Sequence, residues 1–404
     1  MSSTTHSVSS FSQALLWFGA AVSLAEIITG ALIAPLGLQQ GIIAILTGHL
    51  IGAFILYLAG KIGANHRLSA AQTVSLSFGQ YGSYAFSVLN ILQLLGWTAV
   101  MIISGAKAFD VISITLWQYS DESLWSLLIG ALIILWVLLG IKNLTRVNII
   151  IVSALFLAFC VLAYTVFNQP SHIIFINGNM SFGSTVELNI AMSLSWMPLI
   201  ADYTRRLKNI QTGLFASVIS YFIGSSFMFI VGLGAAIYVG SSDITQILLT
   251  AGLGIVALFI VVFSTVTTTF LDVYSAGINL ANLGHKISEK MAAILATITG
   301  TLMALFISMS QYESFLYLIG SVFAPLFAIL FTDYYLLKKG SISSDRLFNL
   351  KNTLLWIFGF IVYHTLMSYH SVIGITVPVI ILISGMTYLI SKLTLSLTLL
   401  VKHK

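Results

Sequence analysis

An acidic residue, Asp272, stands in a stretch that is otherwise apolar or hydroxylated, FSTVTTTFLDVYSAG (263–277). Residues three or four positions apart share one side of a helix, so a helix here would carry a polar side that includes the acid. This side consists of Ser264, Thr267, Thr268, Asp272 and Ser275. Its oxygens offer ligands to a small cation, and donors and acceptors to a planar polar solute. Thr265 and Thr269 lie off this side, and we expect their hydroxyls to bond to their own helix.

A second polar stripe surrounds Trp97 at the same helical spacing. Its members are Asn90, Gln93, Trp97, Met101 and Ser104. Carboxamides beside an indole suit a flat heterocycle, which stacks on the aromatic ring and is recognised at its edge by hydrogen bonds. Trp196, in SLSWMPLIADYTRR (193–206), is a candidate for another wall of the same pocket.

Two further titratable residues lie inside apolar runs. Glu26 is in AAVSLAEIITGALIAPLG (20–37), and His49 is in LTGHLIGA (46–53). His49 either packs through a hydrogen bond or relays a proton, and both interpretations stay open. The sequence contains no recognisable metal-ligand set, phosphate-binding loop or Ser-His-Asp arrangement, so we expect no enzyme and no cofactor.

Long apolar runs carry all of these residues. The chain of 404 residues is 58% hydrophobic and 7% charged, with a mean hydropathy of +1.02, a composition that no water-soluble domain of this length needs. About 20 apolar residues span a bilayer as a helix. We therefore predict an all-α integral membrane protein with twelve transmembrane helices. Their predicted bounds are 12–34, 38–61, 83–107, 123–141, 147–167, 186–204, 212–239, 248–283, 288–309, 313–337, 353–369 and 373–395.

The basic residues predict the orientation of these spans. With the amino terminus inside, Lys107 alone among the 17 Lys and Arg residues falls outside, as the positive-inside rule requires. We therefore expect a multi-pass protein of the cytoplasmic membrane with both termini in the cytoplasm. The net charge of +5 is accounted for by this rule, so we expect no nucleic-acid partner. A monomer is expected, and the lone Cys160 excludes an intramolecular disulfide.

Polar residues and helix breakers interrupt the first and sixth predicted spans, at 20–37 and around Pro198. Non-helical backbone at that depth is tolerated where it lines a cavity or is packed in protein. Paired interrupted helices at equivalent positions point to a transporter built from two inverted repeats. The expected divisions are a cytoplasmic tail at 1–11, a transporter core at 12–340 with repeats over 12–167 and 186–340, and two accessory helices with a C-terminal tail at 341–404.

Six segments together carry a resemblance to a known family. They are LLWFGAAVSLAEIITGALIAPLG, GHLIGAFILYLAGKIGA, LNILQLLGWTAVMI, SLSWMPLIADYTRR, FSTVTTTFLDVYSAG and APLFAILFTDYYLLKKG. Over residues 14–340 the chain resembles the nucleobase:cation symporter-1 family, and most closely its CytX branch, which is linked to hydroxymethylpyrimidine transport and thiamine-precursor salvage. The resemblance implies a LeuT-like 5+5 inverted repeat followed by two C-terminal helices.

The resemblance also implies a heterocycle site among spans one, three, six and eight. The stacking Trp of span three corresponds to Trp97, and an Asn of span eight corresponds to Asp272. Glu26 stands where the family has a Gln, and so does Met101, for which Gln93 one turn earlier is the candidate substitute. The predicted substrate-binding residues are Glu26, Asn90, Gln93, Trp97, Met101, Ser193, Trp196 and Asp272.

Span six departs from the family pattern, because Ser193 occupies the place of a stacking Trp and Trp196 is displaced from it by several residues. A sodium site in some relatives uses backbone carbonyls of span one and hydroxyls of span eight. Here one expected hydroxyl is replaced by Val266. The candidate cation-binding residues are Val22, Ala25, Ser264, Thr267 and Thr268, with Phe263 as a further carbonyl. The coupling ion is therefore expected to be Na+ or H+, and no other metal is expected.

The sequence thus favours a secondary-active importer that couples a small aminopyrimidine, such as hydroxymethylpyrimidine or a related thiamine precursor, to a cation. A cytosine or purine permease is the alternative within transporters. A channel would need a continuous polar pore, whereas the polar groups here cluster at one depth. A membrane enzyme is a third possibility, which product formation without translocation would support.

Overall fold

Helices make up almost all of the chain. The computed structural model describes residues 8–139, 141–168, 178, 180–244, 246–247, 255–284, 287–339, 347–369 and 371–402. The helices of the amino-terminal half are α1 (Ser10–Ala21), α2 (Leu24–Leu32), η1 (Ala34–Leu36), α3 (Leu38–His66), α4 (Ala70–Trp117), α5 (Glu122–Leu139) and α6 (Ile141–Phe167). Those of the other half are α7 (Phe182–Ser195), α8 (Met197–Thr204), α9 (Ile210–Val239), α11 (Ile255–Asn282), α12 (Glu289–Phe306), η2 (Met309–Gln311), α13 (Tyr312–Phe331), η3 (Thr332–Leu336), α14 (Leu350–Leu366) and α15 (Thr376–Lys402).

The predicted spans can be compared with these helices one by one. Within the described residues, nine helices are long and apolar enough to cross a membrane, and the α1–α2 pair, bent by 51°, makes a tenth. The α7–α8 pair and α14, which has 17 residues, stand outside this set, although each coincides with a predicted span. An all-helical membrane fold is therefore confirmed, whereas the count of twelve spans and the 5+5 repeat stay predictions.

The predicted interruptions both occur as breaks between helices. The first span is divided at Val22 and Ser23, whose backbones leave the helical region. The sixth is divided at Trp196, which ends α7 and precedes α8, where Pro198 occupies the first turn. Proline is tolerated there because the first turn of a helix has no partner for its backbone N–H.

The third predicted span, 83–107, belongs to a longer helix than expected. α4 begins after a capping box formed by Ser69 and Gln72 and continues to Trp117. It is kinked at Gly79, whose φ of 76° lies in the left-handed region that glycine adopts without a steric cost. The kink lets one continuous segment serve both as a short connecting helix and as a membrane span.

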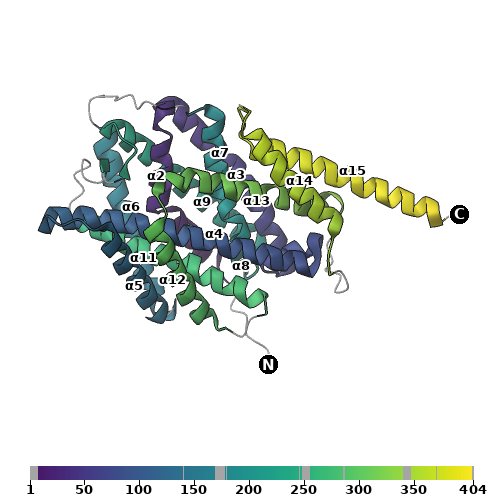
Figure 1. The fold of residues 1–404 in the computed structure, drawn as a ribbon, viewed down its shortest axis with the longest axis horizontal. Coiled ribbons are helices and arrows are strands. Elements are labelled where there is room, and N and C mark those ends of the chain that lie inside the picture. The colour runs from purple at the N-terminus through teal and green to yellow at the C-terminus, as the bar shows by residue number, and fades with distance from the viewer. Residues whose placement is uncertain are drawn as a thin grey trace.

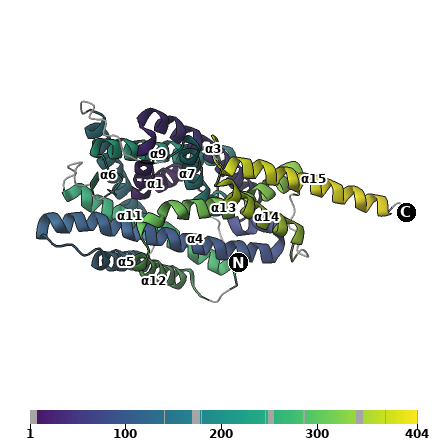
Figure 2. The same cartoon turned by 45° about the horizontal axis from the view of Figure 1, so that its top comes forward.

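Two groups of helices form the body of the molecule (Figures 1 and 2). The first group contains α1, α2, α3, α7, α8 and α9, whose closest neighbours are one another. The second group contains α4, α5, α11 and α12, with the most extensive packing between α11 and α4. α13 packs against α7, α14 and α15, and α15 extends away from the other helices in both views.

The backbones of α2 and α9 approach one another closely inside the first group. A Cβ atom on Gly30 would overlap the carbonyl oxygen of Phe229, and one on Gly232 would overlap that of Ile27. Only glycine is accommodated at such approaches. The contact holds the polar side of α2, which carries Glu26, directly against α9.

A buried carboxyl group fastens the two C-terminal helices to this body. Glu187 of α7 is fully buried and lies 2.6 Å from the hydroxyl of Tyr363 on α14. It also accepts hydrogen bonds from the backbone N–H groups of Ile375 and Thr376 and from the Thr376 hydroxyl, at 2.6–2.8 Å. The amino end of α15 is therefore capped by a side chain from a distant helix, an arrangement that the helix dipole also favours.

Candidate functional site

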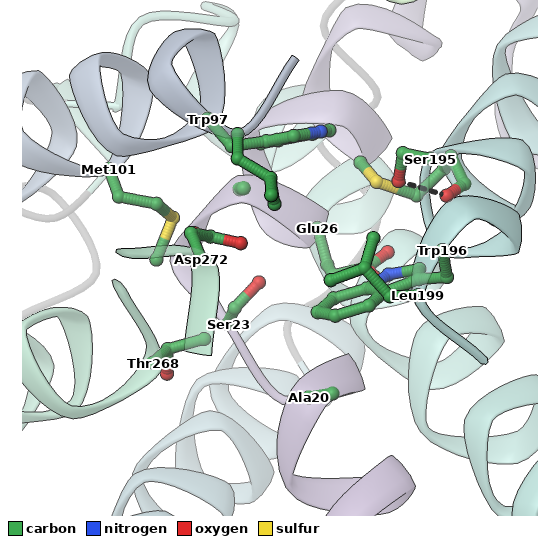
Figure 3. Close-up of a pocket in the computed structure, with 13 residues that line it drawn as sticks. Ala20, Ser23, Glu26, Trp97, Met101, Ser195, Trp196, Leu199, Thr268 and Asp272 are labelled. Carbon is green, nitrogen blue, oxygen red and sulfur yellow. Dashed lines mark hydrogen bonds between the residues drawn. The ribbon is translucent and has the colours of Figure 1, made fainter. Parts of the chain in front are cut away.

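A cavity lies between the first and second helix groups, where both interrupted helices meet α4 and α11 (Figure 3). Its walls leave about 430 Å³ of space not filled by atoms, part of which is open to solvent. The first group lines it with Ala20, Ser23, Ala25, Glu26, Met192, Ser195, Trp196 and Leu199, and the second with Leu94, Trp97, Met101, Thr268 and Asp272. Five of the eight predicted substrate residues are thus brought together: Glu26, Trp97, Met101, Trp196 and Asp272.

Asp272 of α11 points into this cavity (Figure 3). Its side chain is only 7% exposed, yet it makes no hydrogen bond or ion pair with any residue that the structure describes. An unpaired carboxylate at membrane depth costs several kcal/mol, by order of magnitude. Such a group is well placed to bind a ligand that supplies the missing donors or a proton.

Glu26 of α2 lines the same cavity but is differently bonded. One carboxyl oxygen lies 2.6 Å from the Ser225 hydroxyl, and the other accepts a hydrogen bond of 3.3 Å from Tyr221, both on α9. Ser225 in turn lies 2.5 Å from Nε2 of His49 on α3. The carboxyl group of Glu26 therefore has partners within its own helix group, in contrast to that of Asp272.

Two indole rings complete the cavity walls. Trp97 packs edge-to-face on Tyr312 and Phe315, with ring centroids 6.0 and 5.5 Å away. Trp196 packs in the same manner on Trp17 and on Tyr221, with centroids 5.6 and 6.2 Å away. Since these contacts restrain both rings, each offers a fixed aromatic surface to a flat solute.

The carboxamides of the Trp97 stripe point elsewhere. Gln93 donates to the carbonyl oxygen of Ser195 at 2.8 Å, and Asn90 donates to that of Pro198 at 3.3 Å. The first carbonyl belongs to the last residue of α7 and the second to the first turn of α8, on either side of the break at Trp196. Asn90 and Gln93 thus support the break and do not line the cavity, so direct contact with a solute stays a prediction for them.

Ser193 is likewise outside the cavity lining. Its side chain packs so closely against Gly52 of α3 that a Cβ atom on residue 52 would overlap it. Its hydroxyl donates to the carbonyl oxygen of Asn189 at 3.4 Å. Ser195, two residues later, lines the cavity instead, as does Met192. Neither was predicted, although both lie in the interrupted stretch 189–206 that the sequence singled out.

The candidate cation-binding residues are only partly gathered. Ala25 and Thr268 line the cavity, and Val22 ends α1 beside it. Thr267 and Thr268 both donate to the carbonyl oxygen of Ser264 at 2.9 Å, whereas the buried hydroxyl of Ser264 has no partner among the described residues.

Threonine hydroxyls on both sides of α11 donate to carbonyl oxygens of the same helix, so these bonds do not distinguish the side that carries Asp272 from the other. Thr265 and Thr269, which were expected to bond in this way, do so, but Thr267 and Thr268 do so as well. Within the part of the chain that the structure describes, no three His, Cys, Asp or Glu side chains are grouped as metal ligands. Cation binding by this region therefore stays a prediction.

Sequence comparison supplies the class of protein that this fold and cavity belong to. Residues 6–391 match the model of a family described as permease for cytosine/purines, uracil, thiamine, allantoin. The cytosine permease of Escherichia coli strain K12 is 25% identical over 324 residues, covering 77% of this chain and 74% of that protein. The hydantoin permease of Microbacterium maritypicum is 23% identical over 379 residues, covering 85% and 76% respectively.

Solved structures agree on the fold. The inward-facing conformation of Mhp1 superimposes with a TM-score of 0.83 at 18% identity, covering 97% of this chain and 92% of that one. A closed conformation of Mhp1, with bromovinylhydantoin bound, gives a TM-score of 0.80 at 19% identity, covering 95% and 92%. A Na+-coupled sialic acid symporter gives 0.63 at 16% identity, covering 95% and 88%.

The chain has the LeuT-like fold of Mhp1, and the family that it matches is one of multi-pass membrane transporters. Within that class, the chain belongs to the permease family for cytosine/purines, uracil, thiamine and allantoin, the nucleobase:cation symporter-1 family. The family expected from the sequence is thereby confirmed.

Proposed function

We propose that the chain is a secondary-active, cation-coupled importer of a small aminopyrimidine, located in the cytoplasmic membrane with both termini in the cytoplasm. The observation that carries this proposal is the unpaired carboxyl group of Asp272 in a cavity walled by Trp97 and Trp196. Aromatic rings bind flat solutes of many kinds, so the carboxyl group must supply the selectivity.

The edge of an aminopyrimidine fits that carboxyl group. Its exocyclic amine and the adjacent ring nitrogen lie side by side, so two hydrogen bonds to one carboxyl group are possible. An ionised Asp272 accepts from the amine and from a protonated ring nitrogen, whereas a neutral Asp272 donates to the bare ring nitrogen. Paired hydrogen bonds to a carboxyl group are among the strongest that proteins make.

Two solutes share this edge. The similarity of the chain to a cytosine permease supports cytosine as the solute. The resemblance of the sequence motifs to the CytX branch supports hydroxymethylpyrimidine. Met101, which lies where the family resemblance implies a Gln, presents an apolar thioether to the cavity, which suits an apolar substituent such as a ring methyl group. For the coupling cation, Na+ or H+, the proposed surroundings are Val22, Ala25, Ser264, Thr267 and Thr268.

A binding and uptake panel tests the proposal. Purified protein is screened by thermal stabilisation against cytosine, hydroxymethylpyrimidine, uracil, hypoxanthine and a hydantoin, and the solutes that stabilise it are then tested for uptake into proteoliposomes. We expect the two aminopyrimidines to bind and uracil, which has no exocyclic amine, to bind at least tenfold more weakly. Equal binding of uracil would contradict the role given to Asp272.

Counterflow distinguishes the proposed carrier from a channel. Vesicles loaded with unlabelled solute should take up labelled solute faster than empty vesicles, because exchange avoids the return of the empty carrier. A channel would show no such acceleration. Recovery of unmodified solute from the vesicles excludes an enzymatic product.

A further inference from the structure

Three polar side chains from three helices form a continuous hydrogen-bonded chain that begins at the cavity. Glu26 of α2 lines the cavity, Ser225 of α9 lies 2.6 Å from its carboxyl oxygen, and Nε2 of His49 on α3 lies 2.5 Å from the Ser225 hydroxyl. The other ring nitrogen of His49, Nδ1, lies 3.0 Å from the carbonyl oxygen of Ile45. All three residues are buried, and His49 is completely enclosed.

The positions of the hydrogens in this chain follow from its partners. A carbonyl oxygen only accepts, so the contact of Nδ1 with Ile45 requires a hydrogen on Nδ1. In a neutral imidazole Nε2 is then bare and must accept from Ser225. Ser225 has one hydrogen, so Glu26 must be a neutral acid that donates to the Ser225 oxygen.

The alternative arrangement also contains one extra proton. If Ser225 donates to an ionised Glu26, the 2.5 Å contact with His49 needs a hydrogen on Nε2, which makes the ring an imidazolium. An ionised Glu26 with a neutral His49 would leave one of the His49 contacts without a hydrogen, with two lone pairs facing each other. Both satisfactory arrangements therefore hold one dissociable proton, shared by Glu26 and His49 through Ser225.

The proton can move between the two ends without leaving the chain. Glu26 passes its proton to the Ser225 oxygen while Ser225 passes its own to Nε2, which converts a neutral pair into carboxylate and imidazolium. One end faces the solute cavity, whereas His49 lies outside the cavity lining. The hydrogen-bonded series of Glu26, Ser225 and His49 thus connects the solute site with the interior of the first helix group.

The other polar groups around this chain are few. Tyr221 on α9 contacts Glu26, Tyr312 on α13 bonds to Thr29 one turn further along α2, and Asp272 on α11 faces Glu26 across the cavity. On α7 the carboxamide of Asn189 lies beside His49. Neither ion pair found among the described residues, Lys107–Asp243 or Lys339–Asp333, includes these groups. No Lys or Arg in the described part of the chain is therefore positioned to compensate Glu26.

We propose that Glu26, Ser225 and His49 form a proton-binding relay and that the proton held there is the coupling ion, taken up with the solute from outside and released inside. This proposal rests on the proposed transport function. It specifies the coupling cation as H+ and places it at Glu26, Ser225 and His49 instead of at the residues around Val22 and Thr268. Since Glu26 has one end in the cavity, solute and proton occupy adjacent positions, as coupling through a shared site requires. A lower external pH therefore drives accumulation.

The first test needs no solute. Infrared spectroscopy of the purified protein at neutral pH detects the carbonyl band of a buried neutral carboxylic acid, and Glu26→Gln assigns that band to Glu26. Nitrogen-15 NMR, compared with His49→Gln, determines whether His49 is an imidazolium. A proton on either residue supports the relay, whereas an ionised Glu26 beside a neutral His49 overturns it, whatever the protein transports.

The second test separates coupling from binding. In sodium-free proteoliposomes with the membrane potential clamped to zero, a gradient of about one pH unit should drive about tenfold accumulation of a transported aminopyrimidine. Ser225→Ala and His49→Gln should abolish this accumulation but retain solute exchange, since neither residue lines the cavity. Ser225→Thr, which restores a hydroxyl, should recover the accumulation.

A matched control is available at the next position. Ser226 is also buried on α9, but its hydroxyl has no hydrogen-bond partner among the residues described, so Ser226→Ala should keep both accumulation and exchange. A merely structural role of Ser225 would lower thermal stability and leave the response to the pH gradient intact, which would overturn the proposal. The proposal would also be overturned if accumulation by the wild type followed a sodium gradient and did not respond to pH. Loss of solute exchange in correctly folded Ser225→Ala and His49→Gln would overturn it as well.

Discussion

The two helix groups present matching side chains to the cavity, one carboxyl group and one indole each, but the two carboxyl groups are bonded in opposite ways. Glu26 of the first group is held by Tyr221 and Ser225 of a neighbouring helix in that group. Asp272 of the second group has no partner among the described residues. A carboxyl group whose partners are already present contributes to the structure around it, whereas one without partners is available to a solute. Position in the cavity alone does not distinguish the two.

The largest expected effect tests whether the carboxyl group of Asp272 is the one that binds the solute. If Asp272 binds the solute as a carboxylate, Asp272→Asn should reduce aminopyrimidine uptake by at least ~10²-fold, because a carboxamide cannot accept from the amine and from a protonated ring nitrogen together. Thermal stability in detergent should stay unchanged or rise, since the variant removes a buried charge with no partner. Initial uptake rates, corrected for the amount of folded protein, measure the first effect. Normal uptake would show that the solute does not bind an ionised Asp272.

A pair of leucine variants compares the two carboxyl groups by stability. Glu26→Leu should lower the free energy of unfolding by about 1–3 kcal/mol, because it leaves the Tyr221 hydroxyl without its acceptor and the Ser225 hydroxyl without one of its two partners. Asp272→Leu should cost less than ~1 kcal/mol, since no donor is left unpaired. Chemical denaturation of both variants in the same detergent gives the difference. Equal losses would remove the contrast between the two groups.

The indoles are expected to contribute less than Asp272. Trp97→Leu should weaken aminopyrimidine binding by roughly tenfold, as stacking of a base on an aromatic ring contributes about 1–3 kcal/mol. Trp97→Phe should retain most of the affinity, because a smaller ring still stacks. Isothermal titration with the three proteins gives the values. If Trp97→Phe binds the aminopyrimidine as weakly as Trp97→Leu, the indole contributes to binding through a property other than stacking.

The smallest expected effect concerns Met101, on the same side of α4 as Trp97. Met101→Gln introduces a carboxamide into the cavity and should change the ratio of affinities for oxo- and aminopyrimidines by about tenfold or less, the contribution of a single neutral hydrogen bond. Competition between uracil and cytosine measures this ratio. Met101→Leu serves as the control and should leave the ratio unchanged.

The sequence predicted the helices and their two interruptions more completely than the contacts of the cavity residues. Each apolar run contains a helix, and both interruptions fall where Ser23 and Pro198 predicted them. Charge and hydroxyls inside apolar runs are costly, so they mark positions that the fold must accommodate in a special way. This cost is why Glu26 and Asp272 were recognisable in the sequence alone.

Partners from distant segments could not be predicted in the same way. Helical periodicity places Asn90 and Gln93 on the side of Trp97, but it does not show that they bond to carbonyl oxygens of the broken helix. Similarly, nothing in the spacing around Glu187 indicates its partners on α14 and α15, which make it an anchor for the C-terminal helices. Both outcomes depend on which helices become neighbours, and that information is absent from local spacing.

The hydrogen bonds from Asn90 and Gln93 join the second helix group to the broken helix of the first, close to the cavity. If the two groups move relative to each other during transport, these bonds must break or move with the broken helix. Breaking both without replacement by water would add about 2–3 kcal/mol to the activation barrier, which slows the movement by roughly two powers of ten. The two carboxamides would then act as a kinetic brake that limits the turnover number without changing the affinity for the solute.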